Sequence, residues 1–200
     1  VADQLKQNPS TIAESFPEAT VLFADIVGFT QLSAQKSPTE IVTLLNKIFS
    51  AFDQLADQHG LEKIKTIGDA YMVVGGLPMP KPDHAEAIAA MALDMQTAID
   101  TFNQETGEAF IMRIGVSTGP VVAGVIGTHK FTYDLWGDTV NMASRMESHG
   151  IAGRIQVGDL NTIDFTTNMY LKNAARSTLK AKGRCSPTGS KAKNRIQLLG

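Results

Sequence analysis

The stretch ATVLFADIV, residues 19–27, is a nearly continuous apolar run broken by Asp25. A run of this length and composition predicts a buried strand with one carboxylate near its end. An ionised carboxylate in such a place is costly unless a cation or a hydrogen-bonding partner meets it. Asp25 is therefore either a cap at the end of a strand or a residue placed there for chemistry.

Two amphipathic helices are indicated by their start signals and their periodicity. Ser37-Pro38-Thr39-Glu40 is a capping box with proline at the first helical position, and Pro82-Asp83 opens a second helix. Apolar residues recur every three or four positions after each start: Ile41, Leu44, Leu45, Ile48, Phe52 and Leu55, then Ile88, Met91, Ala92, Met95, Ile99 and Phe102. We expect the methionines of the second helix to fill the core rather than to bind a cofactor.

Shorter apolar segments separated by small-residue breaks predict the remaining elements. The expected strands are Leu61–Thr66, Ala70–Gly75, Phe110–Ser117, Val121–Ile126 and Thr132–Trp136, and Asp138 is expected to cap a helix that ends near Ser148. Ile67-Gly68-Asp69 would form a hairpin tip, and Thr118-Gly119-Pro120 a turn between two strands. The β-α-β-β-α-β order predicts an α+β fold with two helices on one face of an antiparallel sheet.

Charge is distributed unevenly along the 200 residues. Residues 1–164 contain all 20 acidic residues and 10 of the 18 basic ones, whereas residues 165–200 contain eight basic residues and no acidic one. The single cysteine, Cys185, excludes an intramolecular disulfide framework, and no uncharged apolar run reaches the ~18 residues of a membrane span. We expect a soluble chain with a basic, divergent tail over residues 164–200.

Asp25 and Asp69 are the first candidates for chemistry. The predicted fold brings the hairpin beside the first strand, which would place the two carboxylates on neighbouring strands. Two such carboxylates suit a pair of hard cations such as Mg²⁺ when substrate phosphates complete the shell. The structural alternative makes Asp25 a strand-end cap and Asp69 a turn residue, and the two residues taken by themselves favour it.

A second constellation lies in YDLWGDTVNMASR, residues 133–145. If Asp138 caps the helix, Asn141 and Arg145 are four residues apart and project from one face. An amide and a guanidinium so placed reach a sugar and a phosphate together. The spacing alone favours the alternative, which is an ordinary exposed helix face.

Four segments together carry a specific resemblance. FADIVGFT (23–30), KTIGDAYMVVGGLP (65–78), RIGVSTGPVVAGVIG (113–127) and YDLWGDTVNMASRMES (133–148) resemble the catalytic-domain motifs of class III nucleotidyl cyclases, in family order. The resemblance implies a ferredoxin-like cyclase homology domain over residues 18–163, with residues 1–17 as a linker from an upstream sensory or membrane segment. It also implies a cytoplasmic, head-to-tail homodimer with an active site at each interface.

The resemblance assigns roles to individual residues. Asp25 and Asp69 match the family's metal-binding aspartates, and Ile26 matches the residue whose backbone carbonyl contacts a metal, which implies two Mg²⁺ ions, with Mn²⁺ as a substitute. Asn141 matches the asparagine that orients the ribose, and Arg145 the arginine that stabilises charge on the reacting phosphate. In the family pattern one chain supplies the metal-binding aspartates, and the other supplies the purine-selecting pair together with Asn141 and Arg145.

Lys65 and Asp134 match the family's purine-selecting pair. Adenine presents an acceptor at N1 and a donor at N6, which a lysine and an aspartate complement, whereas guanine reverses both. Guanylate cyclases of the family typically have glutamate and cysteine at these positions. The resemblance therefore implies an adenylate cyclase that converts ATP to 3′,5′-cyclic AMP and pyrophosphate. The alternatives are a guanylate cyclase and a catalytically weak regulatory domain.

Two places depart from the family pattern. Where relatives carry a phosphate-binding arginine or lysine, His129 stands here, with Lys130 as a substitute. Relatives also end in a hairpin with a phosphate-contacting lysine, for which Lys182 is the candidate and Lys180 the alternative register. RNA-recognition modules share the β-α-β-β-α-β order, but the aromatic pattern that their sheets need is missing, so no nucleic-acid partner is expected.

Overall fold

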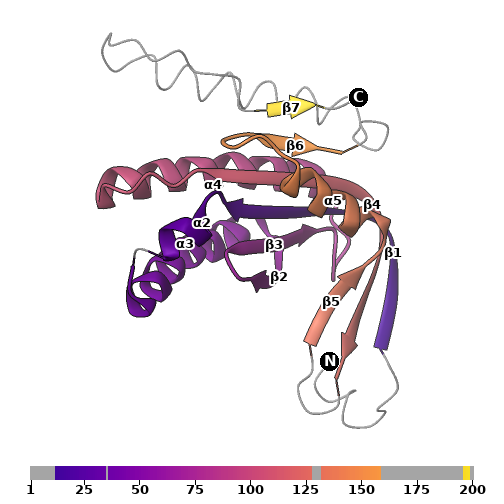
Figure 1. Ribbon diagram of the computed structural model, residues 1–200. Helices are drawn as coiled ribbons and strands as arrows, with labels where there is room; N and C mark the ends of the chain where they lie inside the picture. The colour runs from indigo at the N-terminus through magenta and orange to yellow at the C-terminus, as the bar shows by residue number, and fades with distance from the viewer. Residues whose placement is uncertain (1–11, 35, 128–131, 159–195, 199–200) are drawn as a thin grey trace.

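The computed structural model describes residues 12–34, 36–127, 132–158 and 196–198 (Figure 1). The elements are β1 (Ile12–Ile26), α2 (Phe29–Ser33), α3 (Pro38–His59), β2 (Glu62–Ile67), β3 (Ala70–Gly75), α4 (His84–Thr106), β4 (Met112–Ile126), β5 (Thr132–Trp136), α5 (Asp138–Ser148), β6 (Ile155–Val157) and β7 (Ile196–Leu198). Within these ranges the strands form one sheet in the order β2-β3-β1-β4-β6-β7, and β5 pairs with β4 outside that path.

The long antiparallel pair β1 and β4 forms the centre of the sheet. Its register runs from Ile12 opposite Val125 to Ile26 opposite Met112, and it places Asp25 opposite Arg113. β3 lies antiparallel on the other side of β1. The predicted α+β class is confirmed, but β6 joins β4 in parallel and β7 joins β6 in parallel, so the sheet is mixed rather than wholly antiparallel.

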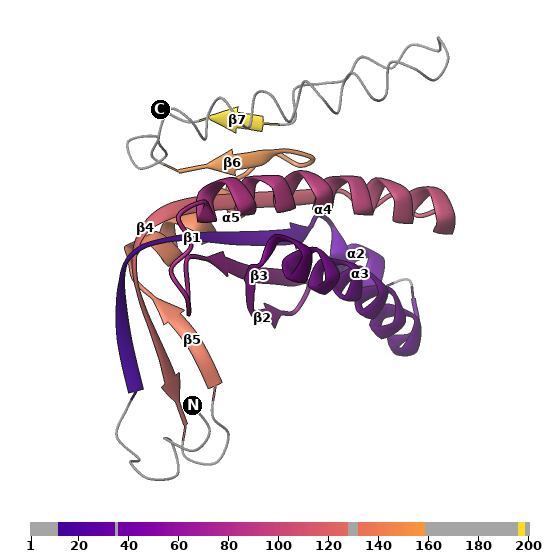
Figure 2. The same cartoon turned by 180° about the vertical axis from the view of Figure 1, so that it is seen from behind.

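Side chains of β1 alternate between two hydrophobic cores, one on each face of the sheet. Leu22, Ala24 and Ile26 pack with α3 and α4, the two helices predicted to share a face, and Met91 and Met95 are core residues there. Val21 and Phe23 belong to the opposite core, together with Ala143 of α5. Asp25 has the same parity as Val21 and Phe23, so it lies on the α5 side (Figures 1 and 2).

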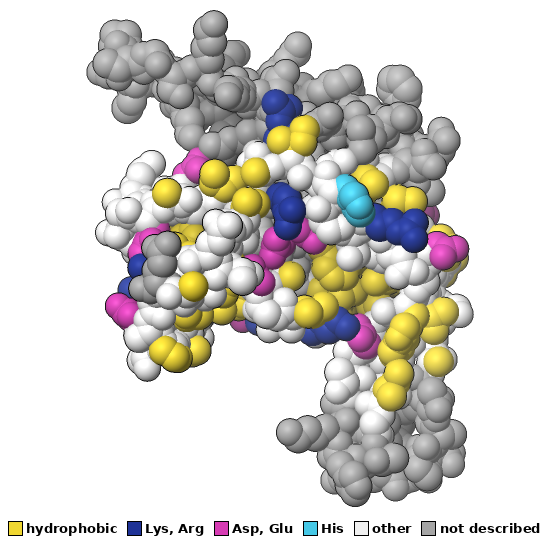
Figure 3. Space-filling model, in the orientation of Figure 1, with side chains coloured by type: hydrophobic (Ala, Val, Ile, Leu, Met, Phe, Trp, Pro, Cys, Tyr) yellow, Lys and Arg dark blue, Asp and Glu magenta, His cyan; other side chains and the backbone are white. Residues whose placement is uncertain are grey.

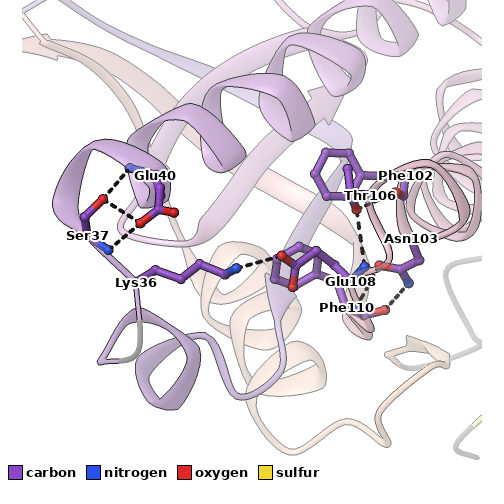
Figure 4. A network of polar contacts seen from close by, with 8 residues as sticks. All are labelled: Lys36, Ser37, Glu40, Phe102, Asn103, Thr106, Glu108 and Phe110. Carbon is purple, nitrogen blue, oxygen red and sulfur yellow. Dashed lines mark hydrogen bonds and ion pairs between the residues drawn. The ribbon is translucent and has the colours of Figure 1, made fainter.

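Both long helices begin where the sequence predicts, and α3 has the predicted capping box. The Glu40 amide donates to Ser37 Oγ, while the Ser37 amide donates to Glu40 Oε2 at 2.8 Å (Figure 4). Lys36 forms an ion pair of 2.7 Å with Glu108, which ties the start of α3 to the segment before β4. Polar contacts thus fix the position of the first turn of α3.

Strand β4 differs from the prediction of two strands joined by a turn at residues 118–120. It is continuous, and Thr118 and Gly119 stay paired with Thr20 and Ala19 of β1. The irregularity lies in the partner strand, where the register shifts between Phe16 and Ala19. A bulge there tolerates the missing N–H of Pro120, so the Gly-Pro pair does not end the strand.

Three boundaries also differ from the predictions. β1 starts at Ile12, inside the segment expected to be a linker, because residues 12–16 pair with the far end of β4. Asp138 is the first residue of α5 and not its cap; Gly137 stands at the cap position without a side-chain hydrogen bond. Residues 196–198, expected to belong to a tail, form β7 beside β6.

Helix α5 lies unusually close to β4 at Gly115. A Cβ added to Gly115 would be 2.1 Å from the Glu147 amide nitrogen and 2.4 Å from the Ala143 carbonyl oxygen. Only a residue without a side chain lets the helix backbone approach the strand so closely. This contact sets the height of α5 above the end of β1.

We predict that Gly115→Ala destabilises the fold by about 3 kcal/mol or more, because the new methyl group would overlap backbone atoms that cannot move independently. Gly107→Ala is the matched control: Gly107 has a φ of 74° but no atom within 4 Å of the added Cβ, so only the left-handed backbone cost of about 1 kcal/mol is expected. Urea unfolding of both variants measures the difference. An equal loss of unfolding free energy in the two variants would contradict the close contact of α5 with Gly115.

Candidate functional site

Asp25 and Asp69 lie together at one end of the sheet. Asp25 is the penultimate residue of β1, and Asp69 follows Gly68 in the two-residue turn between β2 and β3. Because β3 pairs with β1 through Ala24 and Tyr71, this turn lies beside the end of β1. Burial, and then the charge of Asp25, raises the pKa of Asp69 above its usual value. The hairpin prediction therefore holds, and it brings the two carboxylates into one cluster.

Arg113 and Glu147 complete this cluster, and the sequence interpretation missed both. Arg113 Nη2 donates to Asp25 Oδ2 at 2.7 Å and lies 3.3 Å from Glu147 Oε1, within ion-pair range but without a hydrogen bond. Glu147 is 8% exposed, and burial followed by the charge of Asp25 raises its pKa to about 7. A buried glutamate on an otherwise amphipathic helix is a signal that could have identified it.

The donors at this end of the sheet fit a hard divalent cation. Three carboxylates lie near one guanidinium, and burial, followed by the charge of Asp25, raises the pKa values of Asp69 and Glu147. Ile26 buries its side chain in the α3–α4 core, so only its backbone is available to a ligand. Within the described residues, no three His, Cys, Asp or Glu side chains form a closed metal site. Two carboxylates and a carbonyl would instead leave positions open for water and phosphate, as Mg²⁺ prefers.

Lys65 and Asp134 come together from separate elements. Lys65 lies on β2 and Asp134 on β5, and their side chains form a hydrogen-bonded ion pair. The Leu135 amide also donates to Asp134 Oδ1 at 2.8 Å, which fixes the carboxylate. Both side chains remain partly exposed, at 32% and 20%, so the pair is accessible to a ligand.

Asn141 and Arg145 share the outer face of α5. Both residues are exposed, whereas Ala143 and Glu147, each two positions further along, are buried against the sheet. Thr139 Oγ1 donates to the Pro120 carbonyl at 2.7 Å and holds the start of the helix against β4. The helix therefore presents Asn141 and Arg145 away from the side on which Glu147 meets Arg113.

Three further sequence candidates cannot be placed in this site. Lys182, its alternative Lys180, and the pair His129 and Lys130 all lie outside the described residues. Their predicted contacts with phosphate remain predictions.

An arm formed by the outer ends of β1, β4 and β5 extends from the body of the molecule (Figures 1 and 2). Large hydrophobic side chains on β4 and β5 are exposed there: Val122 by 38%, Ile126 by 56% and Trp136 by 38%. Val122 and Trp136 lie opposite each other in the β4–β5 register. Figure 3 shows hydrophobic side chains along this arm and acidic ones gathered near the centre of the same view.

The chain matches the adenylate and guanylate cyclase catalytic domain family over residues 11–195, and it belongs to that family. It is 47% identical to an adenylate cyclase of Mycobacterium tuberculosis, over 92% of this chain and 42% of the relative. It is 43% identical to the guanylate cyclase soluble subunit beta-2 of Rattus norvegicus, over 92% of this chain and 27% of the relative. The chain thus spans less than half the length of these relatives.

A solved structure shares both the fold and the sequence pattern. The catalytic core of a rhodopsin-guanylyl cyclase with converted specificity, in complex with ATPαS, superposes with a TM-score of 0.73 and is 44% identical, over 77% of this chain and 85% of that one. No helix within the described residues combines the length and the apolar composition needed to cross a bilayer.

We predict that Asp69→Asn raises the melting temperature in EDTA, because it removes one of the crowded carboxylates that burial and Asp25 destabilise. The same substitution should weaken Mn²⁺ binding, which electron paramagnetic resonance of free Mn²⁺ measures. Asp83→Asn is the matched control, since Asp83 is exposed and makes no capping hydrogen bond. A lower melting temperature for Asp69→Asn than for the control would show that Asp69 is a structural turn residue.

Proposed function

We propose that this domain is an adenylate cyclase, which forms 3′,5′-cyclic AMP and pyrophosphate from ATP in a homodimer. The observation that carries the proposal is the pairing of Lys65 with Asp134 across β2 and β5. The family includes both adenylate and guanylate cyclases, so the residues that contact the base determine whether ATP or GTP is the substrate. In this chain those residues suit adenine.

The chemistry of the pair supports ATP. The Lys65 ammonium can donate to adenine N1, and the Asp134 carboxylate can accept from the N6 amino group. Guanine would present a donor to the lysine and a carbonyl oxygen to the aspartate, and both mismatches cost free energy in a partly buried site. The two side chains are already in contact with each other. Binding of adenine therefore requires each of them to exchange its present partner for the base, and neither has to move in from a distant position.

Asp25, Asp69 and the Ile26 carbonyl would hold the divalent cations, Mg²⁺ or Mn²⁺. Bound there, such ions lower the pKa of the ribose 3′-hydroxyl and neutralise phosphate oxygens. Arg113 already contacts Asp25, so its guanidinium lies beside the place where phosphates would complete the shell. Its fixed positive charge there favours a triphosphate over a nucleoside.

Asn141 and Arg145 would act, together with the Lys65–Asp134 pair, on a substrate whose phosphates lie at the aspartates of a second chain. They face away from the side of α5 that meets the Asp25 cluster, so a single chain does not direct them at its own cations. Across a dimer interface, Asn141 can orient the ribose and Arg145 can donate to the α-phosphate as its charge develops. The exposed Val122, Ile126 and Trp136 of the arm supply an apolar surface for that interface.

A guanylate cyclase is the second candidate. The observation that favours it is the 43% identity to a guanylate cyclase subunit, which is close to the 47% identity to an adenylate cyclase. The two candidates differ in what Lys65 and Asp134 contact. Direct comparison of ATP and GTP turnover separates them.

We predict that Lys65→Glu with Asp134→Cys shifts the ratio of ATP to GTP turnover toward GTP by about 100-fold or more, because it reverses the donor and acceptor presented to the base. The kcat/KM of each nucleotide, measured with purified protein in Mn²⁺, gives the ratio. Lys63→Glu with Asp53→Cys is the control, since these residues form a similar ion pair between α3 and β2. An unchanged ratio in the first double variant would contradict the assignment of Lys65 and Asp134.

We also predict that Asp25→Ala and Arg145→Ala proteins, each inactive alone, recover activity when mixed. One heterodimer site would contain both an intact Asp25 and an intact Arg145. Mixing in equal amounts should return up to about a quarter of wild-type activity if chains exchange freely, since half the dimers are mixed and each has one intact site. No recovery, despite heterodimers detected by native mass spectrometry, would exclude the shared site.

A further inference from the structure

Glu147 is a buried carboxylate to which the proposed reaction assigns no role. The residue is 8% exposed, and its Oε1 atom lies 3.3 Å from Arg113 Nη2 and makes no hydrogen bond. Arg113 Nε is also buried without a hydrogen-bond partner. The same Nη2 atom donates to Asp25 at 2.7 Å. One guanidinium nitrogen is therefore shared by two carboxylates, with the tighter contact to Asp25.

Stability alone does not account for a glutamate at this position. Burying an ion pair costs desolvation that its attraction often fails to recover, and an apolar residue of similar volume is commonly as stable or more so. The Glu147 side chain is only 11% exposed, so little of it reaches water. The Glu147 carboxylate is therefore buried at a cost in free energy, directly beside the Arg113 guanidinium that pairs with Asp25.

We propose that Glu147 is a positioning residue: by sharing the Arg113 guanidinium with Asp25, it leaves the Asp25 carboxylate able to bind a divalent cation. The inference rests on the proposed function, because it takes Asp25 to be a cation ligand. Without the charge of Glu147, Arg113 has Asp25 as its sole ion-pair partner among the described residues, and a cation must then displace it. With Glu147 present, Arg113 retains a carboxylate partner when the cation arrives.

The experiment measures Mn²⁺ binding to the intact domain without nucleotide, from the electron paramagnetic resonance signal of free Mn²⁺. It is done at about pH 8, above the Glu147 pKa of about 7, so that the carboxylate carries its charge. Glu147→Gln keeps the side-chain shape and should weaken Mn²⁺ binding by about tenfold, within the range for residues of one ion-pair network. Arg113→Gln should tighten binding, because it removes the competing cation. In the Arg113→Gln background, Glu147→Gln should change the affinity by less than about twofold.

Two controls separate positioning from a general loss of charge or of folding. Glu105→Gln removes an exposed carboxylate from α4, which covers the other face of the sheet, and should leave Mn²⁺ affinity unchanged. If either single variant fails to fold, the pair Arg113→Met with Glu147→Met replaces both charges by apolar groups. That protein should melt at or above the wild-type temperature and bind Mn²⁺ at least as tightly as the wild type.

A heterodimer assay tests whether Glu147 acts only from the chain that supplies Asp25 to the active site. In the mixture of Asp25→Ala and Arg145→Ala chains, Glu147→Gln should raise the Mn²⁺ concentration needed for half-maximal turnover only when the Arg145→Ala chain carries it. That chain supplies Asp25 to the intact site. A purely structural role for Glu147 would affect the site from either chain.

In addition to an effect from either chain, three outcomes of the Mn²⁺-binding measurements would overturn the proposal. Glu147→Gln could leave Mn²⁺ affinity unchanged, or it could weaken binding equally in the Arg113→Gln background, which would mean that Glu147 acts on the cation directly. Loss of Mn²⁺ binding in the paired methionine variant would also contradict it. If Asp25→Ala does not alter wild-type Mn²⁺ binding, the proposed cation site itself fails, and that result is distinct from the other three.

Discussion

The antiparallel pairing of β1 with β4 is the constraint on which the rest of the structure depends. It runs along both 15-residue strands and places Asp25 opposite Arg113, so the carboxylate in the apolar run meets its cation inside the sheet. The same pairing separates the two cores, because alternate residues of β1 face α3 and α4 or face α5. A shift of one residue would move Asp25 into the methionine-containing core and leave it unpaired there.

The second constraint is the contact of α5 with Gly115. It fixes α5 close enough for Glu147 to reach Arg113, and it turns Asn141 and Arg145 outward. One face of the helix packs on its own sheet and completes the carboxylate cluster, while the opposite face, with Asn141 and Arg145, is exposed. In the dimer proposed above, that exposed face would meet the substrate held by a second molecule.

The carboxylate cluster and the Lys65–Asp134 pair differ in how well their charges are balanced. Asp25, Asp69 and Glu147 face a single guanidinium, and the pKa values of Asp69 and Glu147 are raised by burial and by their neighbours. Lys65 and Asp134, by contrast, satisfy each other between β2 and β5. Under the proposed function, a divalent cation would add positive charge to the first group, and a base would take over the donor and the acceptor of the second.

The sequence by itself determined the α+β class, both long helices with the capping box of α3, the hairpin tip at Asp69 and the family's motifs. These are local properties: each depends on capping, spacing or turn chemistry within a few residues. Only the tertiary structure decided that β4 passes through Thr118-Gly119-Pro120 without a turn, because the compensating bulge lies in β1, about 100 residues away in the chain. The tertiary structure also decided that Arg113 contacts both Asp25 and Glu147. These contacts depend on the register of β1 with β4 and on the distance of α5 from the sheet, and neither can be predicted from a local sequence pattern.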